Sequence, residues 1–207
     1  GPGEVIALVG PSGEGKTTLL RLLLGLMQPM GGVMELVDAR GTVHTLGTRT
    51  RRYFSYVPQG NTLLSGTIRD NLLLGNPEAT DGDMHQALRM ACADFVLSLP
   101  DAMDTVCGEG GTGLSEGQAQ RIAIARSLLN DPQVIIADEP TGNLDNETAD
   151  GIMKLLTRIN REKGTAIVMV THNRQIFEKY PGRVMICKDE TCTEQRRNDD
   201  IDLELTI

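Results

Sequence analysis

Short apolar runs and longer periodic segments alternate along this chain. Residues 134–137 and 165–170 are nearly continuous apolar runs, which is typical of strands buried on both faces of a parallel sheet. Residues 4–9 form a third run, which leads into a glycine-rich stretch. Because segments with apolar residues at helical spacing separate these runs, the pattern predicts an α/β fold. We expect a mostly parallel sheet flanked by helices.

Three helices are predicted in the middle of the chain. A short one covers residues 67–74, and a longer one covers residues 83–99, where apolar positions recur at i, i+3, i+4 and i+7 until Pro100. The third begins at Ser115. With Gln118 three residues later, this serine fits a capping box, in which each side chain bonds the other residue's backbone N–H.

These segments predict one domain that spans residues 1–207. The stretch 61–130 is almost entirely helical in its pattern and predicts an inserted helical subdomain. Residues 1–60 and 131–207 contain the apolar strands and are expected to form the sheet core of the domain. The domain therefore has a sheet core interrupted by helices.

A small antiparallel portion is also expected. Residues 32–37 and 42–46 read as two short strands around a turn. Residues 183–187 and 191–194 indicate a second hairpin, which follows a short predicted helix at 174–180.

Composition narrows the class of protein. The net charge is −8 and the chain has no long basic run, so we expect no nucleic acid as its main partner. No apolar run reaches the ~20 residues that a membrane-crossing helix needs. The four cysteines show no paired C-x-x-C spacing, and we expect reduced thiols that pack in the fold: Cys92, Cys107, Cys187 and Cys192.

The residues between the first strand and the first helix carry the strongest chemical signal. Residues 10–18 read GPSGEGKTT and match the phosphate-binding loop G-x-x-x-x-G-K-[ST]. Glycines let successive backbone N–H groups turn toward an anion, and the helix N-terminus adds a positive dipole end. Lys16 is expected at the β- and γ-phosphates, and Thr17 as a hydroxyl ligand of Mg²⁺. The whole predicted cradle is Gly10, Pro11, Ser12, Gly13, Gly15, Lys16, Thr17 and Thr18.

Three further strands end in polar residues that complete the predicted site. Ligands of open α/β sheets bind outside the carboxyl ends of the strands, so these residues are expected near the phosphate loop. Asp138 is predicted to hold Mg²⁺, and Glu139 to act as the general base for the attacking water. Gln59 would sense the metal or the water, and His172 would contact the γ-phosphate.

Together, these motifs resemble the nucleotide-binding domain of an ABC transporter. The resemblance covers residues 3–194 and rests on the phosphate loop, YVPQG around Gln59, LSEGQ at 114–118, VIIADEP at 134–140, NLD at 143–145 and THN at 171–173. It implies a phosphate-loop NTPase with a RecA-like core at residues 1–60 and 131–207. It also implies a head-to-tail homodimer or pseudo-dimer that sandwiches two ATP molecules. In that dimer Ser115, Gly117 and Gln118 of one copy would face the nucleotide of the other, and Asp145 would lie at the seam.

The resemblance further implies an ATPase that drives transmembrane partner domains from the cytoplasmic side of the membrane. Residues 63–75 and 106–111 resemble segments of exporter-type members that touch intracellular helices of the transmembrane domains, so an exporter is favoured. Residues 137–145 also resemble stand-alone ATPase subunits of other ABC systems, which remain an alternative.

Other classes of function are weighed against this interpretation. A chromosome-associated ABC ATPase would need a long coiled-coil insertion, and a ribosome-associated one usually carries two such domains. A small-molecule kinase would have no use for LSEGQ or His172, and a sensor without turnover could dispense with Glu139. Phosphate release by the chain would discriminate among these.

The sequence departs from the family pattern at two places, and each departure leads to a prediction. Glu116 stands where the family usually has glycine, and we expect its carboxylate to point outward from the first helical turn. The family's adenine-stacking aromatic residue lies upstream of the phosphate loop, and no residue fills that position here. Weak ATP binding by the isolated chain is therefore predicted.

The last residues form an unusual pattern. Residues 200–207 alternate polar and apolar positions like a half-buried strand. In the family such a strand normally precedes the phosphate-loop strand, so we hypothesise that it pairs beside residues 4–9, with Ile207 close to Gly1.

Overall fold

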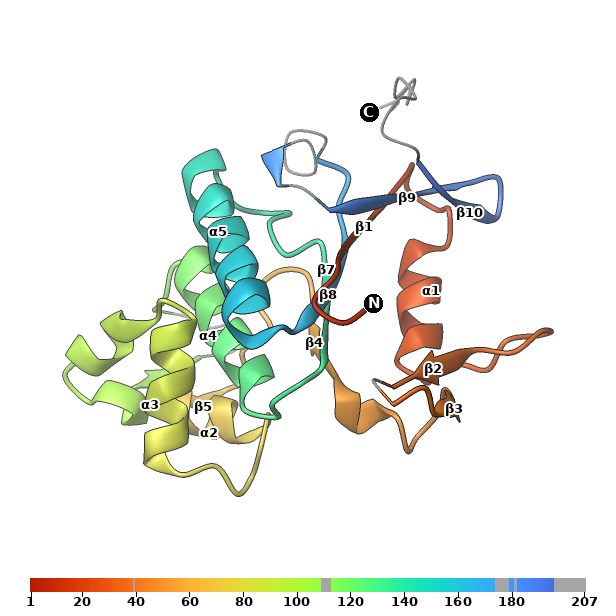
Figure 1. Ribbon diagram of the computed structural model, residues 1–207. Helices are drawn as coiled ribbons and strands as arrows, with labels where there is room; N and C mark the ends of the chain where they lie inside the picture. Colours follow the sequence, from red (N-terminus) through yellow and green to blue (C-terminus); the bar gives the residue numbers. More distant parts are fainter. Residues whose placement is uncertain (39, 109–112, 174–178, 181, 196–207) are drawn as a thin grey trace.

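The computed structural model describes residues 1–38, 40–108, 113–173, 179–180 and 182–195. A six-stranded sheet runs through its centre (Figure 1), and every neighbouring pair is parallel except β10 with β9. In spatial order the strands are β10 (Thr191–Glu194), β9 (Arg183–Lys188), β1 (Val5–Val9), β8 (Ala166–Val170), β7 (Val134–Asp138) and β4 (Phe54–Val57). This confirms the predicted mixed α/β fold with a mostly parallel sheet.

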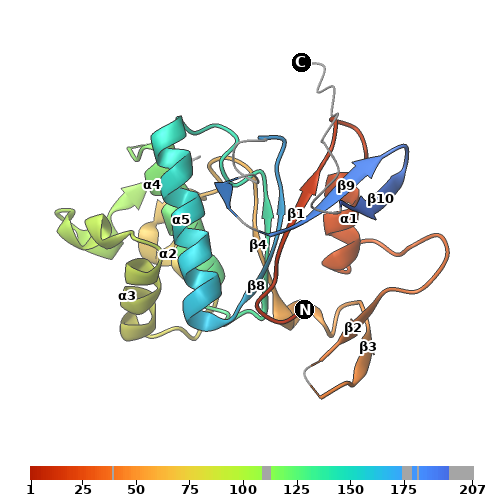
Figure 2. The ribbon, with the colours of Figure 1, turned by 45° about the horizontal axis from the view of Figure 1, so that its top comes forward.

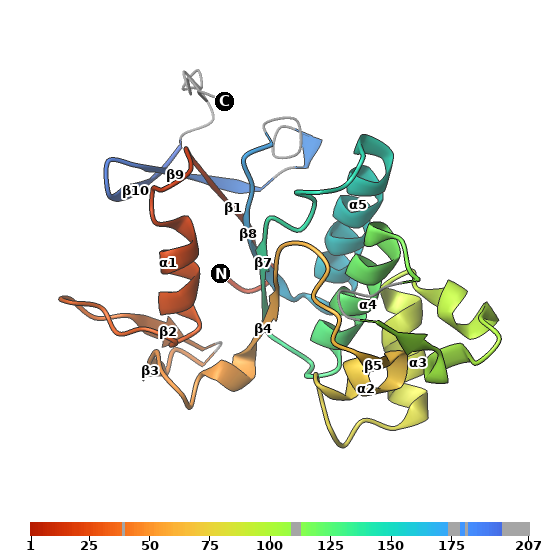
Figure 3. The same cartoon turned by 180° about the vertical axis from the view of Figure 1, so that it is seen from behind.

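Helices cover both faces of the sheet. Helix α1 (Lys16–Leu23) lies on one face, and α4 (Glu116–Leu128) and α5 (Asn146–Lys163) lie on the other (Figures 1 and 3). Side chains of a strand alternate between faces. Leu8 accordingly packs with Leu20 of α1, whereas Ala7 belongs to the larger cluster that includes the buried face of α5.

The small antiparallel pieces lie at the margins. Strands β2 (Glu35–Val37) and β3 (Val43–Thr45) form the predicted hairpin on the α1 side (Figure 2), and the 3-10 helix η1 (Arg51–Tyr53) precedes β4. The predicted hairpin of β9 and β10 is also confirmed. Strand β5 (Gly66–Thr67) pairs antiparallel with β6 (Val106–Cys107), which the sequence pattern did not predict.

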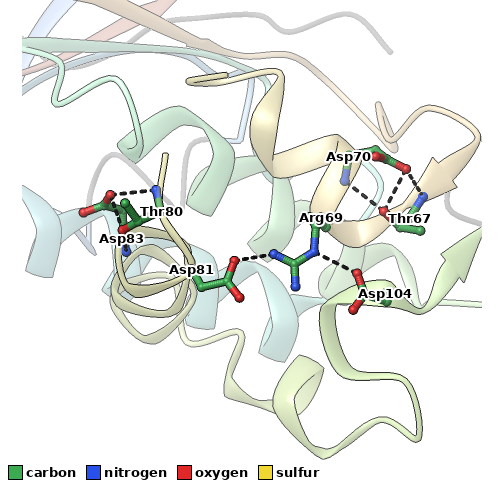
Figure 4. A network of polar contacts seen from close by, with 7 residues as sticks. All are labelled: Thr67, Arg69, Asp70, Thr80, Asp81, Asp83 and Asp104. Carbon is green, nitrogen blue, oxygen red and sulfur yellow. Dashed lines mark hydrogen bonds and ion pairs between the residues drawn. The ribbon is translucent and has the colours of Figure 1, made fainter. Parts of the chain in front are cut away.

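Helical elements dominate the middle of the chain. They are α2 (Ile68–Leu73), α3 (Asp81–Met90), the 3-10 helices η2 (Asp94–Ser98) and η3 (Ala102–Asp104), and α4. Both α2 and α3 begin with a capping box, formed by Thr67 with Asp70 and by Thr80 with Asp83. Figure 4 shows how Arg69 of α2 reaches between Asp81 of α3 and Asp104 of η3.

The prediction of one helix over residues 83–99 is wrong. Helix α3 ends at Met90, and Cys92 has a φ of 49°, in the left-handed region. The N–H of Ala93 bonds the carbonyl of Leu88 at 2.8 Å, a helix-closing arrangement. Arg158 of α5 donates to the carbonyl of Met90 at 2.6 Å. Apolar periodicity continues past this point because η2 still buries Val96.

Two predicted elements involve residues that the structure does not describe. Most of the predicted helix at 174–180 lies outside the described residues, as do the predicted strand at 200–207 and its closure from Ile207 to Gly1. Strand β1 itself has no open edge, because it pairs with β8 on one side and β9 on the other. Within the described part of the chain, no helix combines the length and apolarity needed to cross a bilayer.

Candidate functional site

The loop between β1 and α1 has the backbone of an anion cradle. Gly10 has a φ of 149°, and a Cβ there would overlap the carbonyl oxygen of Cys187, so glycine is required. Gly15 precedes α1 with a φ of 76° and leaves the helix start without a side-chain cap. The first N–H groups of α1 are therefore available to an anion, and the helix dipole favours one there.

Lys16 is folded over this loop. Its side chain is 8% exposed, and its ammonium donates to the carbonyl oxygens of Gly10 at 2.8 Å and Pro11 at 2.6 Å. These charge-assisted bonds keep a positive charge directly beside the loop glycines.

A cavity of about 780 Å³ joins the loop to the other strand ends. Its volume lies within the range that small-molecule sites occupy, ~300–1,000 Å³. The cavity brings together every residue predicted for the phosphate cradle and the catalytic end, and adds Val170, which the sequence did not single out. Its lining is Gly10, Pro11, Ser12, Gly13, Gly15, Lys16, Thr17, Thr18, Gln59, Asp138, Glu139, Val170 and His172.

Asp138, at the end of β7, is held by two hydroxyl groups. The side chain is buried, and its Oδ2 accepts from Tyr56 at 3.1 Å and lies 3.5 Å from the Oγ1 of Thr17. Burial and the Asp138 charge raise the pKa of Tyr56 to about 12, so the phenol stays a donor. Tyr56 was not among the predicted site residues, although it begins the YVPQG motif. It pairs with Ile136 of β7, and strand alternation puts Ile136 and Asp138 on the same face of the sheet.

This arrangement suits a hard divalent cation. Among the described residues, no group of three acidic, histidine or cysteine side chains could hold a metal ion by itself. Mg²⁺ is commonly bound through one or two carboxylates together with substrate phosphates. A carboxylate beside a threonine hydroxyl at the foot of an anion cradle is consistent with that chemistry.

Glu139 and His172 form a contact at the mouth of the cavity. The Nδ1 of His172 lies 2.9 Å from the Oε1 of Glu139, whose side chain is 13% exposed. Glu139 has a φ of 48°, unusual for a residue with a side chain. Its N–H bonds the carbonyl of Val170 at 3.1 Å, which fixes the strained backbone to β8. Strained backbone is often retained at functional sites.

The LSEGQ residues lie apart from this cavity, at the start of α4. Ser115 and Gln118 form the predicted capping box: the Gln118 N–H bonds the Ser115 hydroxyl at 3.2 Å, and the Ser115 N–H bonds the Gln118 side chain at 2.9 Å. Glu116 is exposed, as expected. Gly117 is buried, and a Cβ there would lie 2.5 Å from the Cγ2 of Thr148.

Asp145 caps the neighbouring helix. Its carboxylate accepts from the N–H groups of Glu147 and Thr148 at 3.0 Å each, and from the Thr148 hydroxyl at 2.6 Å. The Thr148 bonds chiefly lower the pKa of Asp145. Asp145 is exposed and does not line the large cavity, so its predicted place at a dimer seam stays a prediction.

The fold and the cavity define a phosphate-loop nucleoside-triphosphatase domain: a parallel sheet with a glycine loop, a lysine and an acidic strand end at one edge. Comparison with known proteins identifies the family. Residues 1–142 match the ABC transporter family, and the chain belongs to it. This confirms the resemblance seen in the sequence and shows an ATPase domain that binds nucleotide.

The named relatives include permeases that bind or depend on ATP. The chain is 42% identical over 193 residues to the mycobactin import ATP-binding/permease protein IrtB of Mycolicibacterium thermoresistibile, covering 89% of this chain and 33% of that protein. It is 40% identical over 172 residues to the ATP-dependent permease MDL1 of Candida albicans, covering 82% and 25%. A bacterial Atm1-family ABC exporter solved with ATP bound matches with a TM-score of 0.77 and 31% identity, covering 91% and 32%.

The chain spans a third or less of the length of these relatives.

Proposed function

We propose that this chain hydrolyses MgATP and drives an ABC exporter. The observation that carries the proposal is the single cavity in which Lys16, Asp138 and the Glu139–His172 pair meet at the phosphate loop. Lys16 would exchange its two carbonyl partners for the β- and γ-phosphate oxygens. The nest of loop N–H groups and the α1 dipole would hold the remaining phosphate charge.

Asp138, Thr17 and Gln59 are the groups we assign to the metal. Bound Mg²⁺ would neutralise charge that develops on the transferred phosphoryl group. Tyr56 donates to Oδ2 of Asp138, the oxygen that lies 3.5 Å from the Thr17 hydroxyl, so the phenol holds the carboxylate beside the second group that we assign to the metal. Gln59 lines the same cavity at the end of β4 and is exposed, so its amide can reach either the metal or the water.

Glu139 is the general base in this proposal. With its Nδ1 protonated, His172 donates to Oε1 of Glu139 and holds the carboxylate in place. The second oxygen, Oε2, then accepts the proton of the attacking water. His172 is 62% exposed, so its ring can also turn toward the γ-phosphate when nucleotide fills the cavity.

We further propose that a second copy completes the site. Ser115, Gly117 and Gln118 lie at an exposed helix start outside the cavity of their own chain, and a helix N-terminus favours an anion. A head-to-tail dimer would bring this helix start over the Lys16 loop of the partner. Asp145 caps the adjacent helix and would lie near the same seam.

The transmembrane partner would contact the helical side of the domain, which we assign to residues 61–130, from the membrane's cytoplasmic side. Leu64, Leu74 and Val106 expose 58%, 57% and 73% of their surface there. The Arg69 bridge to Asp81 and Asp104 fixes α2, α3 and η3 relative to one another (Figure 4). The names of the relatives combine ATP binding with permease or import functions. Export is the direction we propose, because the Atm1-family neighbour is an exporter.

Phosphate release by the full chain tests the hydrolytic assignment. We expect Glu139→Gln to lower turnover by at least ~10²-fold while ATP binding persists. Glu162→Gln is a matched control, because Glu162 is an exposed acid near the end of α5. Unchanged turnover in Glu139→Gln would contradict the assigned base.

A mixing experiment tests the second copy. A chain with Lys16→Ala lacks a working loop, and a chain with Ser115→Arg lacks a working helix start. If each site uses one loop and the other copy's helix, mixing the two inactive variants restores part of the activity. No recovery from variants shown to be folded would refute the head-to-tail arrangement.

A further inference from the structure

Two cysteines face each other across the hairpin that forms the edge of the central sheet. Cys187 of β9 and Cys192 of β10 are directly paired in the strand register, and their sulfur atoms lie 3.3 Å apart. Cys187 is buried, whereas Cys192 is exposed. This contact takes no part in the nucleotide chemistry assigned above.

The turn geometry explains why these side chains approach so closely. Asp189 and Glu190 have φ values of 51° and 61°, which indicates a two-residue type I′ hairpin turn. In such a hairpin the residues that flank the turn, Lys188 and Thr191, form a hydrogen-bonded pair. The next pair, Cys187 with Cys192, is then non-hydrogen-bonded, with Cα atoms ~4.5 Å apart.

That separation falls within the range that disulfides span, ~4.4–6.8 Å between Cα atoms. Because the strands are already in register, joining the sulfurs requires rotation of the two side chains and no backbone rearrangement.

The pair also adjoins the phosphate loop. Val9 of β1 pairs with Ile186 of β9, and the carbonyl oxygen of Cys187 occupies the space where a Cβ of residue 10 would lie. Strand β10 is hydrogen-bonded only to β9 among the described strands, so it is the sheet's edge. A covalent bond here would tie the edge strand to the strand that supports the start of the loop.

We propose that Cys187 and Cys192 are a thiol–disulfide modification site, oxidised by exchange with a low-molecular-weight disulfide. The thiolate of exposed Cys192 attacks the small disulfide, forming a mixed disulfide and releasing one small thiolate. The Cys187 sulfur, after losing its proton to solvent, attacks Cys192 and releases the second thiolate. Two protein thiols are oxidised to one disulfide, and the small disulfide is reduced to two thiols.

The surroundings favour this order of attack. Burial, followed by the contact with Cys192, raises the pKa of Cys187 to about 12. Cys187 therefore rests as a thiol, protected from solvent, and reacts only with a partner that is already in contact with it.

Peptide mapping tests the proposal directly. The full chain is incubated with excess glutathione disulfide, the remaining thiols are alkylated, and the chain is digested with trypsin. Cleavage after Arg183, Lys188 and Arg196 separates the two cysteines onto peptides 184–188 and 189–196. We expect these peptides to be joined, two hydrogens lighter than their sum, and to separate on reduction.

Matched variants sharpen the result. Cys192→Ser should abolish the joined peptide, whereas Cys92→Ser, which removes the other exposed cysteine, should leave it intact. The oxidised chain should also unfold at a temperature about 4–8 °C higher than the reduced chain, since a short loop is closed. Glutathione retained on Cys192 with Cys187 still alkylated would overturn the proposal. This outcome is independent of ATP hydrolysis, so it leaves the proposed function untouched.

Discussion

Gly117 offers the sharpest test of how the start of α4 is built. A Cβ at this position would lie 2.5 Å from the Cγ2 of Thr148, whereas apolar carbons pack best at ~3.5–4.0 Å. The methyl group cannot easily rotate away, because the Oγ1 of Thr148 donates to Asp145 at 2.6 Å. Gly117→Ala therefore forces an overlap of about 1 Å, estimated from that optimum, between α4 and α5.

The cost follows from this geometry. Overpacking a tight contact costs ~1–3 kcal/mol, and replacing a helical glycine by alanine returns up to ~1 kcal/mol. We expect a net loss of about 1–2 kcal/mol in the free energy of unfolding. For a chain of this size, that corresponds to a fall of roughly 2–8 °C in the melting temperature.

Thr148→Ser provides the matching rescue. It removes Cγ2 and keeps the hydroxyl that bonds Asp145, so Gly117→Ala with Thr148→Ser should regain most of the lost stability in urea unfolding. Thr157→Ser is the control, since Thr157 lies on the same helix and its hydroxyl bonds Met153 instead. Full stability of Gly117→Ala alone, or equal rescue by Thr157→Ser, would refute the packing argument. If the rescued chain is stable but does not hydrolyse ATP, position 117 must lack a side chain for a second reason, which we place at the proposed face toward the second copy.

Three further outcomes are expected. Asp145→Ala should lower the urea midpoint of unfolding at neutral pH, and Asp145→Asn should lower it much less, because asparagine also caps helices well. The pKa of Asp145 is lowered in the folded state, so its stabilisation is complete above the ordinary carboxyl pKa and is lost as pH falls through the folded value; unfolding curves at several pH values would show this. Tyr56→Phe should raise by roughly 10-fold the Mg²⁺ concentration at half-saturation in nucleotide-binding titrations, and leave metal-free binding unchanged; an unshifted titration would rule out positioning of Asp138 by the phenol. Arg158→Met should lower stability by ~1–3 kcal/mol in urea unfolding, with Arg158→Lys intermediate, and a neutral effect would show that the cap of α3 is unimportant.

The main elements were predictable because their patterns report burial. Residues 134–137 are apolar on every position since β7 is covered by α1 on one face and α5 on the other. The β9–β10 hairpin was likewise visible. The end of α3 was not, because Cys92 rather than a glycine takes the left-handed position that closes the helix. Arg158, which bonds the Met90 carbonyl there, comes from α5 and lies 68 residues away in sequence from Met90.

The candidate site was predictable to the extent that motifs encode chemistry locally. Short sequence motifs identify the loop glycines, Lys16 and the residues that end β4, β7 and β8. The contact of Tyr56 with Asp138 could not be predicted from such a motif, because it depends on strand order. The two residues are 82 positions apart in sequence, and they meet because β4 and β7 are neighbours in the sheet. The pairing of His172 with Glu139 depends in the same way on β8 lying beside β7.

Lys16 shows how the loop is kept ready for an anion. Its ammonium is bound to two carbonyl oxygens of the loop that it serves, so the side chain is already confined before any phosphate arrives. Confinement in advance lowers the conformational entropy that binding must remove. Arginine at this position would be a poor substitute, because its guanidinium is a broad planar group with donors in a rigid fork, whereas the lysine ammonium is a compact point charge with freely rotating donors. The lysine thus both stabilises the strained glycine loop and supplies the charge that an arriving triphosphate would take over.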